Sequence, residues 1–404
     1  MMAMDVSPDS LLVDLTARGG GDRCCLSGWA PAEVDGTWTV GGESRIVLPA
    51  PQRPATYVLV FNFRPLVANG HLTAQRVLVE VNDEPVAEFR IDRRTVRTCV
   101  LPWPLARRAP DLCITLRLPD AARPADIGLN NDHRLLGVHV ASLQLYPDVY
   151  EAWQDDTALC GDEPVAIDMA TVMAVEQMPL HDLMLKFESL GQNCEFGLVQ
   201  RRCQAEPLGL LRFSSTPLPR LLSALEARFE GMGAPEATSV SLGSNGREYM
   251  VNDARFGFVY HAWVNAGEMT PEDLQKREAR RVPFLVRKLL EDLEGGEKIF
   301  VFKGMGAMEE EEVFPLAMAI RRYGPNTLLL VTLADAEHRP GTVEARAPGF
   351  LVGYIDRFAP GDNAHDLSLG MWVKVCREAY RLRLAAKGMR TQASAVRAAP
   401  SQVY

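Results

Sequence analysis

The chain has no long apolar segment and no excess of basic residues. No apolar run in its 404 residues reaches the about 20 residues that a membrane-spanning helix needs. Residues 1–10 carry Asp5 and Asp9 and lack a basic segment followed by an apolar one, so we expect no secretory signal peptide. A net charge of −9 is opposite in sign to that of most nucleic-acid binders. We therefore expect neither a membrane span nor a nucleic-acid partner.

Motifs for metals, cofactors and disulfide frameworks are also missing. The eight cysteines include the adjacent pair Cys24 and Cys25, but the sequence has no CxxC pair, no HExxH motif and no Cys/His cluster. This predicts no metal site and no cofactor. Cysteines without framework-like spacing favour free thiols in a reducing compartment, so a cytoplasmic location is expected. The sequence leaves the oligomeric state open.

The N-terminal part of the chain has the pattern of an all-β domain. Within residues 1–147, eight short strand-like runs alternate with clusters of Gly, Pro, Asn and Asp. Val77, Val79 and Val81 alternate with other residues, as expected for a strand with one buried face. Strands at this spacing predict a β-sandwich of the jelly-roll type.

The C-terminal part alternates strands with helices. Residues 183–386 contain continuous apolar runs such as 298–303 and 327–333, separated by helical patterns. Such runs are typical of buried parallel strands, so we predict an α/β domain with a mostly parallel sheet. Residues 148–182 are expected to form an ordered connection, and residues 387–404 a disordered tail. The predicted fold class is thus a β-sandwich followed by an α/β domain.

One cysteine lies at the predicted start of a helix. A strand-like run ends at Leu190, a tight turn follows, and a helix is predicted from Glu195. The N-terminus of a helix favours a thiolate, which would make Cys194 a nucleophile. Backbone N–H groups there, with the amide of Gln192 or Asn193, would stabilise an oxyanion. The alternative is that Cys194 is a small buried residue at a strand–helix junction.

The residues around this cysteine resemble a known family. Ser189-Leu-Gly-Gln-Asn-Cys194, followed by Leu210-Leu-Arg-Phe-Ser214, is similar to the opening motif of bacterial papain-like cysteine peptidases. The resemblance spans residues 183–385. It implies a hydrolase in which Cys194 is the nucleophile and His261 its base.

The chain departs from this family at one motif. It reads Ser215-Thr-Pro-Leu-Pro219 where the family has Pro-Phe-Asp-Trp. His365 is the alternative base for Cys194, because it lies in a polar loop in which Asp366 would orient an imidazole. The sequence leaves both histidines open.

The predicted sandwich carries candidate glycan-binding residues. Trp38 and Trp103 are aromatic platforms of the kind that stack on sugar rings, as is Trp29, and Asp132 with Arg134 forms a polar cluster. The run of residues 131–138 resembles a motif of jelly-roll modules found beside bacterial polysaccharide-building enzymes. The alternatives are that the tryptophans pack the core and that the Asp–Arg pair ties a loop to the sheet.

Three functions remain open at this point. The first is a cysteine hydrolase or acyl-transferase that acts on an amide or ester, with a peptide or glycan as substrate. The second is a glycan-assembly protein without covalent catalysis, which binds a sugar or activated sugar. The third is a non-catalytic scaffold that binds carbohydrate or a partner protein. A sugar or phosphate site at the strand ends would use the basic residues Arg212, Lys303 and Arg357.

Overall fold

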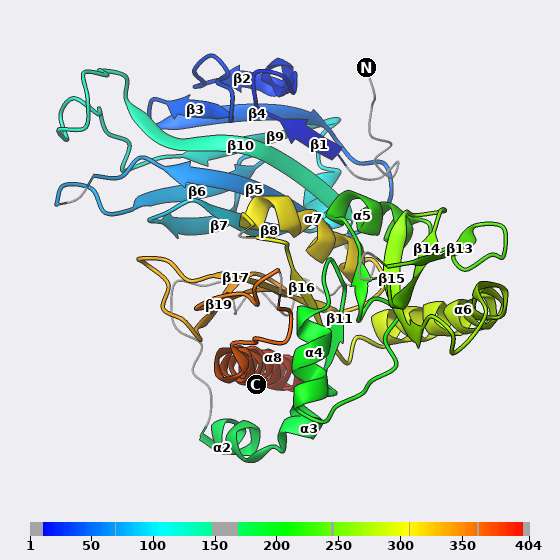
Figure 1. The fold of residues 1–404 in the computed structure, drawn as a ribbon. Helices are drawn as coiled ribbons and strands as arrows, with labels where there is room; N and C mark the ends of the chain where they lie inside the picture. The colour runs from blue at the N-terminus through cyan, green and yellow to red at the C-terminus, as the bar shows by residue number, and fades with distance from the viewer. Residues whose placement is uncertain are drawn as a thin grey trace. The chain divides into compact units, whose positions relative to one another are not determined.

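The computed structural model describes residues 11–68, 70–147, 169–243, 246–306, 308–361 and 363–398 (Figure 1). The chain divides into two compact units. The first comprises Met1–Pro164 with Arg346–Pro348, and the second comprises Val165–Ala345 with Gly349–Tyr404. No helix in the described residues is both long and apolar enough to cross a membrane.

The first unit contains two five-stranded sheets whose paired strands are antiparallel. One sheet has the order β1-β10-β5-β8, with β3 beside β10; its strands are β1 (Leu11–Asp14), β3 (Thr37–Val40), β5 (Tyr57–Pro65), β8 (Thr95–Leu101) and β10 (Leu136–Pro147). The other has the order β2-β4-β9-β6-β7; its strands are β2 (Cys25–Ser27), β4 (Glu43–Pro49), β6 (Gln75–Val81), β7 (Glu84–Ile91) and β9 (Asp111–Arg117). Two short helices, η1 (Gly21–Cys24) and α1 (Trp103–Ala106), interrupt the strands. The predicted all-β architecture is confirmed.

Alternating side chains build the core of this unit. Val77, Val79 and Val81 are fully buried, as their spacing predicts. The connection from β6 to β7 uses Asn82 and Asp83, whose φ angles are 50° and 66°. Two successive positive φ angles are those of a type I′ turn, which matches the twist of the strands that it joins. Asn and Asp tolerate this conformation, so the local sequence explains the hairpin.

A five-stranded sheet forms the centre of the second unit, in the order β11-β16-β17-β19-β18. The pairs β11–β16, β16–β17 and β17–β19 are parallel. Its strands are β11 (Phe187–Ser189), β16 (Ile299–Lys303), β17 (Thr327–Leu333), β18 (Val343–Ala347) and β19 (Phe350–Ile355). Every residue of β16 is buried, so its continuous apolar run has the expected environment.

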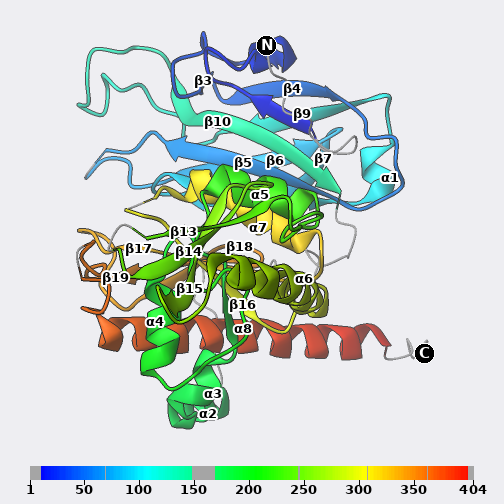
Figure 2. The same cartoon turned by 45° about the vertical axis from the view of Figure 1, so that its right-hand side comes forward.

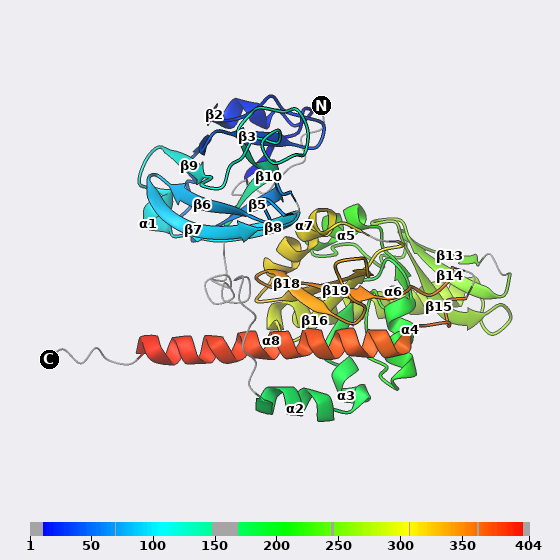
Figure 3. The same ribbon diagram turned by 90° about the vertical axis from the view of Figure 1, so that its left-hand side faces the viewer.

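Helices pack against this sheet. Helix α8 (Leu369–Ala398) runs along the sheet, as Figure 3 shows, and shares an apolar core with α4 (Glu195–Arg202) and with Ile299 and Val301 of β16. Helix α7 (Glu310–Arg321) packs on β17 and β19. These layers hold the start of α4 close to the end of β11, where the candidate nucleophile lies.

A second sheet of this unit is antiparallel, with the order β12-β15-β14-β13. Its strands are β12 (Ser214–Ser215), β13 (Thr238–Leu242), β14 (Glu248–Asp253) and β15 (Phe258–Asn265). Helix α5 (Leu218–Glu226) follows β12, and helix α6 (Pro271–Gly295) lies beside the sheet (Figure 2). In β15, Phe258 and Tyr260 are buried while His261 and Trp263 occupy the opposite, more exposed face. The sheet therefore presents His261 on an accessible surface.

The predicted connection and the predicted disordered tail are each described only in part by the structure. Residues 148–168 lie outside the described residues, and the rest of the connection forms α2 (Met169–Gln177) and α3 (Leu180–Met184). The disorder predicted for the tail is wrong for residues 387–398, which continue α8. This stretch is rich in Ala, Arg and Gln, which are good helix formers, so propensity favours extending the helix. Residues 399–404 lie outside the described residues.

Candidate functional site

Cys194 is the residue immediately before helix α4, at the end of a tightly held turn. Gly191 has a φ angle of 85°, and a Cβ atom there would lie 2.1 Å from the Thr216 hydroxyl. The backbone N–H of Gln192, itself at a φ angle of 67°, donates to that hydroxyl at 2.6 Å. At position 191, only glycine can adopt the positive φ angle and also avoid a clash with the Thr216 hydroxyl without strain. The turn therefore packs closely against residues 211–216, which include β12.

His261 is attached to the same segment. Its backbone N–H donates to the carbonyl of Phe213 at 3.1 Å, and Ser214 pairs with Tyr260. The turn before Cys194 and the strand that carries His261 thus contact one short element from two sides. No hydrogen bond joins the Cys194 thiol to the His261 ring within the described residues.

Glu248 is a site residue that sequence reasoning missed. Both of its carboxylate oxygens lie 3.1 Å from His261 Nδ1, and its Oε1 also accepts the backbone N–H of Trp263 at 3.1 Å. A carboxylate on Nδ1 fixes that nitrogen as the protonated one and leaves Nε2 free to accept a proton. The only sequence signal was an acidic residue at the start of a hairpin strand. The pairing of β14 with β15 places Met250 opposite His261 and shifts register between Glu248 and Met250.

The thiol does not have the acidity that a helix N-terminus predicts. Burial raises the pKa of Cys194 to about 11, and the charge of Glu248 adds to the rise. The prediction of a lowered thiol pKa is therefore wrong. Desolvation of the thiolate and repulsion by a carboxylate outweigh the dipole of an eight-residue helix. At neutral pH Cys194 is a protonated thiol.

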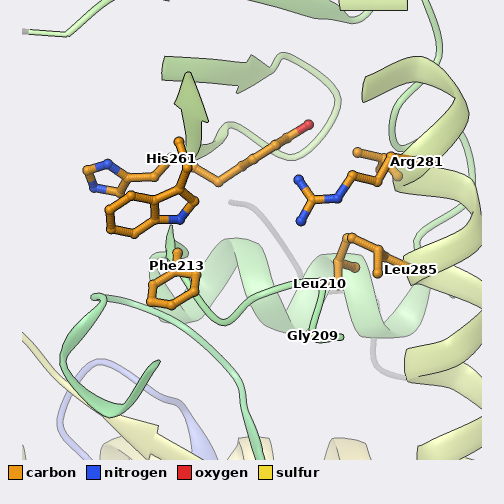
Figure 4. A pocket seen from close by; sticks show the side chains of 9 residues that line it. Gly209, Leu210, Phe213, His261, Arg281 and Leu285 are labelled. Carbon is orange, nitrogen blue, oxygen red and sulfur yellow. The ribbon is translucent and has the colours of Figure 1, made fainter. Parts of the chain in front are cut away.

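The cavity beside His261 is small. It has a volume of ≈ 30 Å³ and is lined by residues of helix α6, strand β15 and the loop that precedes β12 (Figure 4). Arg281 extends toward it from α6, opposite Phe213 and His261. Such a volume holds roughly one water molecule. A peptide or sugar would have to bind on the open surface around Trp263, whose exposed fraction is 45%.

The two predicted oxyanion residues differ. The side-chain oxygen of Asn193 accepts the backbone N–H of Glu195 at 3.0 Å, and its amide nitrogen donates to the carbonyl of Gly304 at 3.3 Å. The Asn193 amide is therefore engaged through its oxygen with the first residue of α4 and through its nitrogen with Gly304. Gln192 has a buried side-chain oxygen without a hydrogen-bond partner in the described structure. Its side chain remains the candidate of the two.

Two of the three predicted substrate-binding cations are buried in structural contacts. Lys303 Nζ lies 3.0 Å from the carboxylate of Glu195, and both side chains are almost fully buried. Arg212 donates to the carboxylate of Glu206 at 2.5 Å and to the carbonyls of Gly197 and Ala205. These bonds satisfy backbone and carboxylate groups that the core would otherwise leave unpaired. The assignment of Lys303 and Arg212 to substrate binding is therefore corrected.

The third predicted cation, Arg357, binds the loop that carries the alternative base His365. Arg357 donates to the backbone carbonyl of Asp366 at 2.8 Å and to its carboxylate at 2.7 Å. Asp366 thus holds the loop to Arg357 instead of orienting His365. The His365 side chain is exposed. Within the part of the chain that the structure describes, no carboxylate pairs with His365 as Glu248 pairs with His261, which makes His261 the better candidate base.

The predicted glycan-binding residues are largely engaged in contacts within the sandwich. Asp132 and Arg134 form a two-oxygen ion pair, with a shortest distance of 2.6 Å. The structure therefore favours their alternative role in tying the loop before β10. Trp38 lies edge-on to His139 with a guanidinium over its ring. Trp103 packs against the apolar core of the sandwich.

A larger groove lies elsewhere in the first unit. It has a volume of ≈ 440 Å³ and is lined by residues of η1, β2, the following loop and neighbouring positions: Leu15, Asp22, Cys25, Leu26, Ser27, Gly28, Trp29, Ala30, Pro31, Ala32 and Thr37. The volume is within the range of about 300–1,000 Å³ that is usual for small-molecule sites. Trp29 is fixed there by a bond from its indole N–H to the carbonyl of Arg45 at 2.9 Å.

Comparison with known proteins gives structural neighbours only. No known family and no curated protein matches the chain. The xylan-binding module CBM15 is 11% identical over 34% of this chain and 95% of that module, with a TM-score of 0.23. The module CBM36 in complex with calcium and xylotriose is 11% identical over 34% of this chain and 98% of its own length, with a TM-score of 0.22. A family GH115 4-O-methyl-α-glucuronidase is 12% identical over 28% of this chain, with a TM-score of 0.18.

These similarities fall on the N-terminal part of the chain, where the neighbours are carbohydrate-binding modules. The chain spans only 14% of the length of the glucuronidase. TM-scores of this size carry no argument about function. No family match supports the resemblance of residues 183–385 to papain-like peptidases, which stays a prediction.

Proposed function

We propose that the N-terminal β-sandwich binds a carbohydrate chain in the groove beside Trp29. The observation that carries this proposal is the groove itself, because its ≈ 440 Å³ can hold a small ligand. The cavity at His261, with a volume of ≈ 30 Å³, is too small to hold such a ligand.

The lining of the groove suits a sugar. An indole offers an apolar face for the C–H groups of a sugar ring, and the Trp29 ring is held in place by its own hydrogen bond. Leu26 lines the same groove and is 64% exposed, which adds apolar surface. Asp22 and Ser27 supply acceptors and a hydroxyl for sugar hydroxyls. The Thr37 hydroxyl donates to the carbonyl of Ala30 and can still accept.

The test is binding of the full chain to a panel of soluble polysaccharides, measured by affinity electrophoresis and tryptophan fluorescence. Trp29→Ala is expected to weaken binding about tenfold or more, which corresponds to about 1.4 kcal/mol. Trp103→Ala is the matched control, since it removes a half-buried tryptophan of the same unit away from the groove lining. Asp22→Asn, at an exposed position, tests the polar contact without a change of shape. Equal losses in Trp29→Ala and Trp103→Ala, or no binding to any polysaccharide, would refute the proposal.

A second function is favoured by one specific observation, the contact of Glu248 with His261. We propose that the second unit is a cysteine hydrolase of low intrinsic activity. His261 Nε2 takes the thiol proton as Cys194 Sγ attacks the carbonyl carbon of an amide or ester. The proton passes to the leaving amine or alcohol as the carbonyl–leaving-group bond breaks. Water then hydrolyses the thioester and returns the thiol, while Glu248 stabilises the imidazolium at each stage.

This second proposal is tested on ester and peptide substrates with Cys194→Ser and Glu248→Gln. Both variants are expected to lower turnover at least a hundredfold, because one removes the nucleophile and the other the group that orients its base. Cys113→Ser, which changes another half-buried thiol, should leave turnover unchanged. Turnover that survives in Cys194→Ser would exclude the mechanism.

A further inference from the structure

A buried histidine of the sandwich faces two carboxylates. His139 lies on β10, its side chain is 2% exposed, and its Nε2 is buried without a hydrogen-bond partner in the described structure. That nitrogen lies 3.5 Å from Asp35 Oδ1 and 3.8 Å from Glu33 Oε2. A buried polar atom without a partner is uncommon and needs an explanation.

We propose that Glu33, Asp35 and His139 form a binding site for one divalent transition-metal ion, with Zn²⁺ as the ion that fits best. None of its three residues lines the groove, although Ala32, the neighbour of Glu33, does.

The spacing of the three ligand atoms supports a shared ion. All of them lie within 4.8 Å of one another. Two ligands at about 2.1 Å from a tetrahedral ion are about 3.4 Å apart, which is close to the nitrogen–oxygen distances at His139. The same distances are too long for good hydrogen bonds. The arrangement thus has the dimensions of a metal site more than those of a hydrogen-bonded cluster.

The backbone holds the two carboxylates over the ring. Glu33 and Gly36 close a turn, in which the N–H of Glu33 donates to the carbonyl of Gly36 at 2.6 Å. A Cβ atom on Gly36 would lie 2.5 Å from His139 Cε1, so this turn rests directly on the imidazole. Arg64 binds Asp35 Oδ2 at 2.9 Å, which leaves Oδ1 directed to His139. A ligand carboxylate held by an outer hydrogen bond is usual in metal sites.

The donor set selects the kind of ion. One imidazole nitrogen and two carboxylate oxygens are ligands that Zn²⁺ accepts, and a set of three leaves a fourth position for water or a bound group. Ca²⁺ and Mg²⁺ prefer oxygen ligands alone. Arg64, together with the positive charge of Arg94 near His139 and Arg134 near Glu33, offsets the two carboxylates.

No sequence motif indicates this site, and the proposal revises the prediction of no metal. Glu33 and Asp35 precede β3, whereas His139 lies on the last strand of the sandwich. They meet because β3 pairs with β10, with His139 opposite Trp38. No local spacing motif records that contact.

The test is Zn²⁺ titration of the full chain by isothermal calorimetry, with Ca²⁺ as comparison. Thiols also take up Zn²⁺, so the informative comparison is between chains that keep all cysteines. Glu33→Gln combined with Asp35→Asn is expected to lose one equivalent of bound Zn²⁺, and each single variant to weaken that equivalent at least tenfold. Glu84→Gln is the control, because it removes an exposed carboxylate from the other sheet and should change nothing.

A second variant separates the metal site from a mere charge effect. Arg64→Gln removes a positive charge, which by charge alone would tighten Zn²⁺ binding, but it also removes the outer hydrogen bond that orients Asp35, so Zn²⁺ should bind several-fold more weakly. Circular dichroism confirms that each variant is folded. Equal Zn²⁺ uptake in the wild type and in the Glu33/Asp35 double variant would overturn the proposal. Loss of Ca²⁺ binding in place of Zn²⁺ binding would overturn the assignment of His139 as a ligand.

Discussion

His261 and Glu248 are joined through Nδ1, which lies 3.1 Å from both oxygens of the carboxylate. This contact makes the His261 ring a directed acceptor through Nε2 and places a negative charge close enough to raise the pKa of Cys194. The same carboxylate therefore supports a base and opposes formation of the thiolate. A hydrolase built in this way would transfer the thiol proton during attack rather than keep a resting ion pair.

Glu248→Gln is predicted to separate reactivity from turnover. Loss of the carboxylate charge lowers the pKa of Cys194 from about 11, so alkylation of this thiol by iodoacetamide at about pH 8 should become several-fold faster. Hydrolysis should fall, because His261 loses the group that orients it. Alkylation is followed by mass spectrometry of the Cys194 peptide. Glu268→Gln, an exposed carboxylate beyond the same hairpin, is the control. An unchanged alkylation rate in Glu248→Gln would contradict the electrostatic argument.

The sequence predicted those parts of the fold that depend on local pattern. Val77, Val79 and Val81 alternate and are buried, and Phe258 and Tyr260 share the buried face opposite His261. Hydrophobic periodicity records such features directly, because it fixes which face of a strand is covered. The position of Cys194 before a helix follows from the same local signals.

The site could not be predicted because its partners depend on strand pairing. Glu248 meets His261 because β14 pairs with β15, and Asp35 meets His139 because β3 lies beside β10. The sequence predicted that Lys303 would be free to bind a substrate, yet its side chain is paired with Glu195 in the core. Whether a charged residue is free or already paired is a tertiary property, so one sequence cannot record it.

The buried thiols should make the free energy of unfolding decrease at alkaline pH. The folded state holds the pKa of Cys194 at about 11, above the about 8.5 of an unfolded thiol. Between these values the unfolded chain has lost the thiol proton while the folded chain retains it, so stability falls as pH rises. Below about pH 8.5 this contribution is fully present. Cys99, whose pKa burial raises to about 12, acts in the same direction.

Urea denaturation of the wild type at pH values between about 7.5 and 10.5 should therefore give a steadily decreasing free energy of unfolding. Cys194→Ala should show a smaller decrease over the same interval, because one of the groups that cause it is gone. Identical slopes for the two proteins would mean that the thiol is not protected from ionisation in the folded state.

Lys303→Met is predicted to destabilise the second unit by about 3–5 kcal/mol. The variant leaves the Glu195 carboxylate buried, with the indole N–H of Trp372 as its remaining partner in the described structure, and it also removes a cation that lies 4.0 Å from the centre of the Phe358 ring. Arg357→Gln, which breaks an exposed ion pair, should cost about 1 kcal/mol or less. Chemical denaturation of both variants measures the contrast. Similar small losses would indicate that Lys303 reaches solvent and is available to a ligand.

Gly191→Ala tests whether the turn before Cys194 is as tightly held as the structure indicates. The new methyl group would have to displace the Thr216 hydroxyl, from which it would lie 2.1 Å, while the backbone stays at a φ angle of 85°. We expect a loss of about 1–3 kcal/mol, since strain at a positive φ angle is added to the clash. The turn positions Cys194 relative to β12, so alkylation of this thiol should also change its rate. Gly370→Ala is the matched control in the first turn of α8, where the methyl group meets nothing within 4 Å, and it should stabilise the helix by about 0.5–1 kcal/mol. A neutral effect of Gly191→Ala would mean that the turn relaxes freely, and Cys194 would then not be held in the fixed position that a nucleophile requires.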